Sequence, residues 1–524
     1  MSTASLDDRQ QLHRLGYAQE LFRSMGGFQN FAISFTIISI LAGCLTSYYI
    51  AFSQGGPVAI TWGWLIVGAF CTIVALAMAE IASTYPTAGG LYFWASRLGT
   101  PRWGWFTGWF NLVGQIAVTA AIGYGASIFL TSLLNLLWNY PNSTGWLLFT
   151  YGYIILGAAL INMFKVPITA MLNTVSAWWH MAGVLFIVAV LIVVPDHHQS
   201  ASFVFTKTIN NTGFSGHGFG SIVFWFVFAT GLLMAQYTIT GYDASAHMSE
   251  ETKQASRGAA WGLLMSVVVS VFFGFILLVA VTFAVPDVAG TLSAGGYDVQ
   301  YIWDTSLGRP WAELLLLIAV VAQLFCTIAS VTSASRMNFA FSRDRAVPGH
   351  QLWSRVSKRD RVPIFSVWMI AALAFLVMVP TIWNAYVGYQ VGTSVAVIGL
   401  YIAFVLPIIL RLKAGDAFEK GAWSLGRHYK WIDAVAIVWI AFISLVFLMP
   451  VVPQGIPWHS DFSWQLSNYT LLTVGGAFVL FGGWYVLSAH KWFKGPIRQG
   501  SDEELARIER EYGEGAAPAA PVSA

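Results

Sequence analysis

The chain has 524 residues, of which 57% are hydrophobic and only 10% are charged. Soluble proteins carry roughly a quarter charged residues, so this composition excludes a cytosolic enzyme, a disordered chain and a nucleic-acid-binding protein. The expected surroundings are a lipid bilayer. The net charge of +3 indicates no polyanionic partner, and the three cysteines lie in apolar stretches without metal-ligand spacing, so no metal or other cofactor is expected.

Long stretches without charge predict the membrane spans. Glu80 is the only charged residue from Phe28 to Thr84, and the stretches 103–164 and 362–410 contain none. Each is far longer than the ~20 residues that one spanning helix needs, so each holds two or more crossings separated by turns. The sequence predicts twelve helices, at 28–52, 58–84, 103–137, 146–164, 167–194, 219–248, 257–285, 311–343, 363–382, 386–411, 431–450 and 469–490.

The positions of the basic residues predict the orientation. With the N-terminus in the cytoplasm, the outer loops contain only Lys207 and Arg309 of the 27 Lys and Arg residues, as the positive-inside rule requires. One helix more or fewer would move the basic loop 343–361 outside, so an even number of crossings is favoured. We therefore expect both termini on the cytoplasmic side of a plasma or inner membrane.

On this interpretation the chain has four parts. They are a cytoplasmic N-terminal segment (1–27), a ten-helix core (28–411), two additional transmembrane helices (412–490) and a cytoplasmic tail (491–524). Within the tail, the segment from Ser501 to Tyr512 predicts a short, charged helix with an N-terminal cap. The tail is not expected to carry chemistry.

Two of the predicted helices contain residues typical of an interruption. In the first, small and hydroxyl residues from Ser39 to Thr46 lie at mid-membrane, where an unwound backbone would expose N–H and C=O groups to a ligand. A close helix–helix contact through small residues explains the same stretch. The sixth helix repeats the pattern from Tyr237 to His247 and adds Gly241 and an acid, Asp243.

The acid in the sixth helix has two interpretations. A buried Asp is costly unless it is satisfied, so Asp243 either accepts hydrogen bonds from freed backbone N–H groups or binds substrate or a proton directly. The two interruptions lie five helices apart, as in an inverted pair of helices 1–5 and 6–10 with a site where the broken helices meet. Helix N-termini attract a carboxylate and exposed carbonyls attract an ammonium group, so such a site suits a zwitterion.

Four stretches carry a resemblance to a known family. They are Met25–Phe28 with Phe35–Ile40, Gly55–Pro57 with Trp62–Trp64, Glu80–Tyr92, and Ser335–Pro348. On these stretches the sequence resembles the amino acid–polyamine–organocation (APC) permeases, in their amino acid/choline branch of GABA permease-like carriers. The resemblance implies an all-α polytopic membrane protein with 12 transmembrane helices. Ten of them would form a five-plus-five inverted-repeat, leucine-transporter-like core with discontinuous helices 1 and 6, which carries out secondary active transport.

The resemblance also implies roles for residues at the two interruptions. The backbone of the first would hold the substrate carboxylate and amino group, although the family's glycine-rich signature is diluted here to Ala42-Gly43-Cys44. Tyr237 corresponds to a gating aromatic, with simple packing as the alternative. The candidate substrate-binding residues are Ser39, Ala42, Gly43, Cys44, Thr46, Tyr237, Thr240, Gly241, Tyr242 and Asp243.

Glu80 and the loop 85–90 correspond to the family's cytoplasmic gate. We expect Glu80 to pair with a basic residue such as Arg336 or Arg97, because a partly buried ion pair can act as a switch. An ordinary acid at the membrane interface is the alternative.

Two coupling ions are considered. His180, in the middle of the fifth helix, is the proton-coupling candidate because imidazole titrates near neutral pH and some proton-coupled relatives place a lysine in this part of the helix; a neutral packing histidine is the alternative. For sodium, Ser330, Thr332 and Ser333 of the eighth helix would offer hydroxyl oxygens beside first-helix carbonyls, although such hydroxyls often bond within the protein. The proton ranks above sodium.

The sequence thus predicts a transporter and no enzyme. The leading hypothesis is a permease for a small amine-bearing solute, an amino acid such as GABA, with proton symport or exchange. Tyr237, Tyr242 or Trp225 could face an ammonium or trimethylammonium group, so a choline, ethanolamine or polyamine permease is the second hypothesis, and a non-transporting solute sensor is the third. Nothing repeats as in a channel pore, and no nucleophile–base pair points to an enzyme. The oligomeric state is left open.

Overall fold

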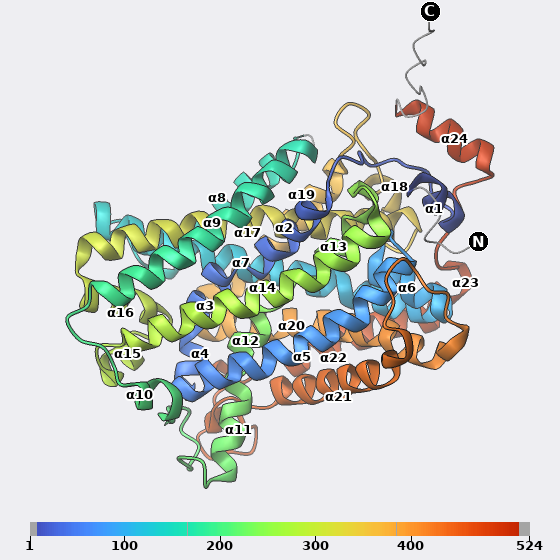
Figure 1. The fold of residues 1–524 in the computed structure, drawn as a ribbon. Helices are drawn as coiled ribbons and strands as arrows, with labels where there is room; N and C mark the ends of the chain where they lie inside the picture. Colours follow the sequence, from blue (N-terminus) through green and yellow to red (C-terminus); the bar gives the residue numbers. More distant parts are fainter. Residues whose placement is uncertain (1–7, 165, 384, 513–524) are drawn as a thin grey trace, which may run out of the picture.

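The structure is a computed structural model that describes residues 8–164, 166–383 and 385–512. It is a bundle of long helices that run side by side (Figure 1). Within the described residues, eleven helical stretches are long and apolar enough to cross a membrane, and a shorter apolar stretch, Ile222–Thr238, lies where the sixth span is predicted. These stretches match the twelve predicted spans in order, so the predicted all-α, polytopic architecture is confirmed.

The described residues form the following α-helices, a few of which are short segments at interruptions or in loops. They are α1 (Asp8–Leu15), α2 (Gly27–Ile38), α3 (Ile40–Thr46), α4 (Tyr48–Ser53), α5 (Pro57–Thr84), α6 (Gly90–Leu98), α7 (Pro101–Trp138), α8 (Thr144–Ile161), α9 (Val166–Val193), α10 (Ala201–Thr206), α11 (Ile222–Gly231), α12 (Leu233–Thr238), α13 (Ala244–His247), α14 (Ala255–Phe283), α15 (Val288–Ser293), α16 (Asp298–Leu307), α17 (Arg309–Arg343), α18 (His350–Trp353), α19 (Ile364–Met378), α20 (Ala385–Ala414), α21 (Tyr429–Leu448), α22 (Thr470–Trp484), α23 (His490–Trp492) and α24 (Asp502–Glu511).

The two strands of the described chain join the loops at the ends of two spans. β1 (Gln54–Gly55) follows α4 and pairs antiparallel with β2 (Ile209–Asn210), which precedes α11. The pairing therefore connects the loop after the first crossing to the loop before the sixth.

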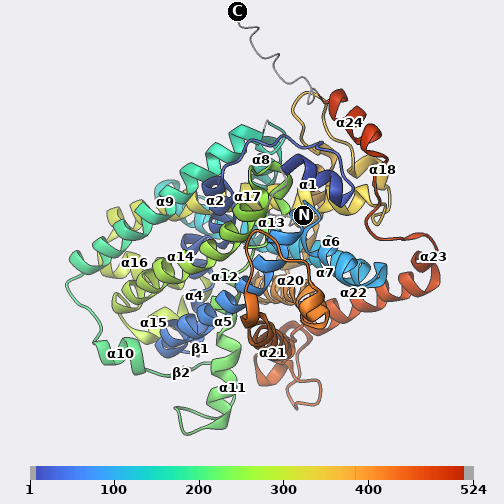
Figure 2. The same cartoon turned by 45° about the vertical axis from the view of Figure 1, so that its right-hand side comes forward.

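The helices differ in how much of their surface faces other helices. In α7, 89% of the apolar stretch is buried, whereas in the last span, Thr470–Trp492, only 11% is. α7 packs along α17 and α20, while large apolar side chains such as Phe272 and Leu376 stay exposed at positions that suit lipid. α7 is thus central, and α22 lies at the edge of the bundle (Figure 2).

Both described ends of the chain lie at one end of the bundle. α1, α18 and α24 gather there, at the right in Figure 1, and α10, α15 and α16 lie at the other end. We call these the terminal end and the far end. The predicted tail helix is confirmed as α24, which begins with a reciprocal cap between Ser501 and Glu504.

The first and sixth crossings are the interrupted ones. Between α2 and α3, Ser39 adopts a left-handed conformation with φ of 39°, which breaks the helical hydrogen-bond ladder. The interruption is narrower than predicted, because Ile40–Thr46 is helical. In the sixth crossing, residues 239–243 separate α12 from α13, and Gly241 there has φ of 91°, a conformation that glycine adopts without strain.

Candidate substrate and coupling site

The two interrupted crossings touch where α3 meets α12. A Cβ atom on Gly43 would lie 2.6 Å from the Thr238 side-chain oxygen and 2.9 Å from the Thr238 Cα atom. Only glycine permits this approach. The small residue at position 43 therefore allows close packing between the two broken helices. Of the two explanations offered for the stretch from Ser39 to Thr46, an interrupted helix and a close helix–helix contact, both are present.

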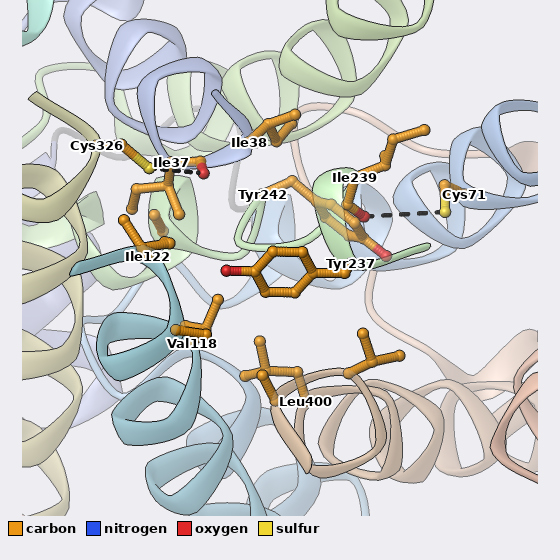
Figure 3. Close-up of a cluster of buried hydrophobic side chains, with 14 of the residues drawn as sticks. Ile37, Ile38, Cys71, Val118, Ile122, Tyr237, Ile239, Tyr242, Cys326 and Leu400 are labelled. Carbon is orange, nitrogen blue, oxygen red and sulfur yellow. Dashed lines mark hydrogen bonds between the residues drawn. The ribbon is translucent and has the colours of Figure 1, made fainter. Parts of the chain in front are cut away.

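A small cavity of about 10 Å³ lies beside this contact, with room for about one water molecule. Five of the predicted residues line it, namely Ala42, Gly43, Thr46, Tyr237 and Thr240. The other lining residues are Ile37, Ile38, Val118, Ile122, Thr238, Gln323 and Cys326. The Tyr237 ring lies at the centre of the surrounding cluster (Figure 3). The structure is therefore closed around this cavity, which in this conformation is too small for a molecule much larger than water.

The other predicted residues lie in the walls behind the cavity. Cys44 is fully buried, and the Tyr242 hydroxyl donates to the Tyr401 hydroxyl at 3.2 Å. The N–H groups of Ala42 and Gly43 both donate to the Ser39 carbonyl at 2.8 Å. In this closed state these two amides are thus already bonded within the chain.

Backbone carbonyls at both interruptions face cysteine thiols. The Cys326 sulfur lies 3.2 Å from the Ile37 carbonyl oxygen, and the Cys71 sulfur lies 3.9 Å from that of Ile239 (Figure 3). A thiol is a weak hydrogen-bond donor. Both carbonyls therefore keep acceptor capacity that a stronger donor, such as an ammonium group, could use.

Gln323 of α17 is a cavity residue that the sequence analysis missed. Its side chain is fully buried, and neither its amide nitrogen nor its amide oxygen has a hydrogen-bond partner in the structure. Leaving such a group unpaired typically costs ~1–3 kcal/mol. A ligand in a widened cavity would find a free donor and a free acceptor there, and bonding to them would remove this cost. The signal was available, since Gln323 is the one amide in the apolar run from Leu314 to Cys326.

His180 of α9 supports the first interruption. Its Nδ1 atom lies 2.8 Å from the Ser176 carbonyl oxygen, and its Nε2 atom lies 2.7 Å from the Ser39 hydroxyl. A carbonyl only accepts, so Nδ1 carries a proton, and in the neutral ring Nε2 accepts from Ser39. The ring is fully buried, and no carboxylate of the described residues pairs with it.

Asp243 lies at the second interruption and is fully buried. The Gln115 side-chain nitrogen of α7 donates to its Oδ2 atom at 2.8 Å, and the Nε2 atom of His247 lies 3.3 Å from the same oxygen. The predicted alternative, in which freed backbone N–H groups satisfy Asp243, is wrong: its carboxylate faces side chains, and it makes no side-chain cap to α13. The other oxygen, Oδ1, has no partner among the described residues.

Glu80 pairs with a basic residue, as predicted, but neither suggested partner, Arg336 or Arg97, is the right one. Glu80 accepts from Arg411 at 2.8 Å and from the Leu425 N–H at 2.9 Å, whereas Arg336 pairs with Glu251 at 2.8 Å. Arg97 is exposed. The physical reason is that the end of α5 faces α20 and the segment after it, not α17.

The family follows from the comparisons with known proteins. The sequence model of the family described as "Amino acid permease" matches residues 25–478, which is most of the chain. The chain belongs to this family. Amino-acid permease BAT1 of Arabidopsis thaliana and its homolog in Oryza sativa subsp. japonica are each 38% identical to this permease, over 93% of its length and 95% of theirs. Amino-acid permease 2 of Neurospora crassa is 27% identical over 93% of the permease and 88% of its own length.

The permease does not bring the candidate sodium ligands to a first-helix carbonyl. Ser330 bonds to Thr119 of α7 at 2.7 Å, and Thr332 donates to Asn162 of α8 at 2.5 Å. The Ser333 hydroxyl is buried without a partner in the described chain. The α17 atom that meets the Ile37 carbonyl is instead the sulfur of Cys326.

A larger cavity of this permease, about 700 Å³, lies between α7, α19, α20 and α22. Its walls are almost wholly apolar and include Val113, Ile116, Leu373 and Val395. Its lining includes no charged residue and one side-chain amide, that of Gln465, whereas a polar ligand needs several convergent polar groups. The smaller cavity between the interrupted helices is therefore the candidate substrate site.

Proposed function

We propose that this permease is a secondary active transporter for a small amine-bearing solute, an amino acid such as GABA, which works by alternating access with proton symport or exchange. The observation that carries the proposal is the cavity at the contact of the two interrupted helices, lined by Tyr237, Gln323 and unwound backbone. Peptide groups and one amide, with no fixed charge, fit a net-neutral zwitterion.

The cavity walls favour an ammonium group near the carbonyls. The Ile37 carbonyl is met by the thiol of Cys326 (Figure 3), and the Tyr237 ring offers a π face to a cation. The Ile239 carbonyl meets the thiol of Cys71 and also accepts from the Tyr401 hydroxyl at 3.4 Å. Gln323 is then free to bond the carboxylate. Trp225 is 46% exposed and does not line the cavity, so of the aromatics considered Tyr237 fits best. Because the Tyr237 ring could equally face the cation of choline, ethanolamine or a polyamine, these solutes remain the second candidate class.

Alternating access is supported by the asymmetry between the two ends of the bundle. At the terminal end, three buried ion pairs of 2.8 Å, Glu80–Arg411, Glu251–Arg336 and Glu250–Arg343, join different elements. At the far end, a cavity of about 170 Å³ is lined by polar groups that include Gln54, Asn211 and Gln390. We propose that the terminal end is cytoplasmic and closed in this conformation, in a plasma or inner membrane.

For the coupling ion, the sulfur of Cys326 beside the Ile37 carbonyl favours a proton, because a hard cation such as sodium prefers oxygen ligands. The hypothesis that His180 carries this proton stays a prediction. Its contacts also fit a neutral residue that holds Ser39 at the interruption.

The test is counterflow in proteoliposomes loaded with unlabelled solute, with GABA, other amino acids, choline and polyamines tried in turn. Labelled GABA or another amino acid is expected to accumulate transiently only when the vesicles contain the same solute. Binding without counterflow would identify a sensor. Counterflow of choline or a polyamine but of no amino acid would favour the second candidate class.

A further inference from the structure

His247 ends the sixth crossing, and one of its ring nitrogens is fixed as a donor. Its Nδ1 atom lies 2.9 Å from the carbonyl oxygen of Ala88, in the loop between α5 and α6. Because a carbonyl only accepts, Nδ1 carries a proton. A neutral His247 therefore has a bare lone pair on Nε2.

That lone pair would face a carboxylate. Nε2 lies 3.3 Å from Oδ2 of Asp243, and both side chains are fully buried. A bare imidazole nitrogen and an ionised carboxylate repel each other at this distance, and burying the uncompensated charge of Asp243 is costly. One additional proton between the two atoms makes the pair neutral and turns the repulsion into an attraction.

The surrounding charges do not replace this proton. The titratable or charged groups on elements packed against α13, near its end of the bundle, are Glu250 and Glu251 of the 3₁₀ turn Ser249–Glu251, Arg336 and Arg343 of α17, Arg257 of α14, and Tyr92 and Arg97 of α6. Arg336 and Arg343 are paired with Glu251 and Glu250. α2 carries no charged residue, and from α7 the pair meets the neutral amides of Asn111 and Gln115.

The pair is connected directly to the loop 85–90. Ala88 accepts from His247 through its carbonyl and donates through its N–H to Glu250 at 3.0 Å. Gly90, with φ of 47°, lies so close that an added Cβ would be 3.0 Å from the imidazole ring. Asp243 at the other side of the pair immediately follows the unwound Gly241–Tyr242 segment. A change of charge at the pair thus acts on the second interruption and on this loop together.

We propose that Asp243 and His247 bind the proton that drives transport, which rests on the proton-coupled transport proposed above. The proton enters from the far end with the solute and neutralises the pair in the closed state. When the terminal end opens, the proton leaves to water, and a carboxylate and a neutral imidazole remain. The net charge of the pair changes from zero to −1, and the His247 contact to Ala88 keeps its own proton throughout.

The test compares wild type, H247Q and H490Q in proteoliposomes. H490Q is the matched control, since Nδ1 of His490 likewise bonds to a carbonyl oxygen, that of Tyr485 at 3.0 Å, and His490 pairs with no carboxylate in the described structure. Two rates are measured with the labelled amino acid that gives the strongest counterflow: counterflow at equal pH on both sides, and uptake driven by an inward acid gradient of one pH unit. One coupled proton supplies about tenfold accumulation for such a gradient.

Wild type and H490Q are expected to show this gradient-driven accumulation. H247Q is expected to keep counterflow and to lose the response to the gradient. Gradient-driven accumulation by H247Q would overturn the proposal, as would wild-type counterflow that no acid gradient accelerates. Absence of wild-type counterflow for every solute would instead refute the proposed function. If H247Q does not fold, D243N is used in its place. The ratio of gradient-driven uptake to counterflow is then compared with that of wild type, and an unchanged ratio would overturn the proposal.

Discussion

Gln323 is the residue for which the structure makes the sharpest prediction. We expect Q323L to melt at a higher temperature than wild type, because it removes an amide that is buried without partners. The same change removes a donor and an acceptor from the cavity. The KM for the transported amino acid is therefore expected to rise about tenfold or more, the typical worth of a hydrogen bond to a charged group. Thermal unfolding in detergent and initial uptake rates measure the two effects.

T327V is the matched control for Q323L. Thr327 lies one turn further along α17, and its hydroxyl donates to the Gln323 carbonyl within the helix. Both the melting temperature and KM should stay near wild type in this variant. A Q323L protein that is less stable than wild type would contradict the view that the Gln323 amide is unpaired. A Q323L protein that keeps its KM would show that Gln323 has no role in holding solute.

For single residues, the sequence identified candidates but did not reveal their contact partners. Glu80 could be singled out because it is the only charge in two spans, but its partner, Arg411, lies 331 residues away, and sequence distance does not disclose which helices pack together. His180 and His247 look alike in the sequence. Only the fold shows that one meets hydroxyl and carbonyl groups and the other a carboxylate.

At the level of elements, the interruptions were predictable and their geometry was not. Small and polar residues in two apolar spans located both breaks, because lipid tolerates irregular backbone only where protein encloses it. At the break, the Ser39 hydroxyl contacts His180, and that contact joins two different helices. Such a tertiary contact leaves no local pattern in the sequence.

The contact between α3 and α12 gives the second prediction. G43A would place a methyl group against the backbone of Thr238, so α3 and α12 must separate, and such overpacking typically costs ~1–3 kcal/mol. We expect a lower melting temperature and a strong loss of counterflow. Gly476 of α22 has no atom within 4 Å of an added Cβ, so G476A is the matched control and should transport normally. Full activity of G43A would show that transport does not require this close contact.

For the whole molecule, the order of the apolar helices followed from charge and hydropathy alone, but the assembly of the two chain ends did not. The tail helix α24 was predicted as an isolated capped helix. In the structure its Glu509 bonds to His13 of α1 at 2.6 Å and to the Gln19 N–H at 3.0 Å. Docking of one terminus on the other is a long-range contact between polar segments, for which the sequence carries no periodic signal.

Asp344, directly after α17, ties these terminal segments to the bundle and predicts a pH dependence. It accepts from the hydroxyls of Tyr17 and Tyr92 and from the Ile497 N–H at 2.7–2.8 Å. Burial raises the pKa of its carboxyl from 3.8 to about 6. The folded state then binds this proton more tightly than the unfolded state, so the contribution of Asp344 to stability falls as pH rises from about 4 to about 6 and is flat above.

D344N keeps an acceptor and has no charge to titrate. We expect the melting temperature of wild type minus that of D344N to increase by a few degrees when the pH is lowered from 7 to 4.5. A difference that does not change with pH would mean that Asp344 stays ionised in the folded protein, in which case the terminal segments would be held by the charged carboxylate over the whole range.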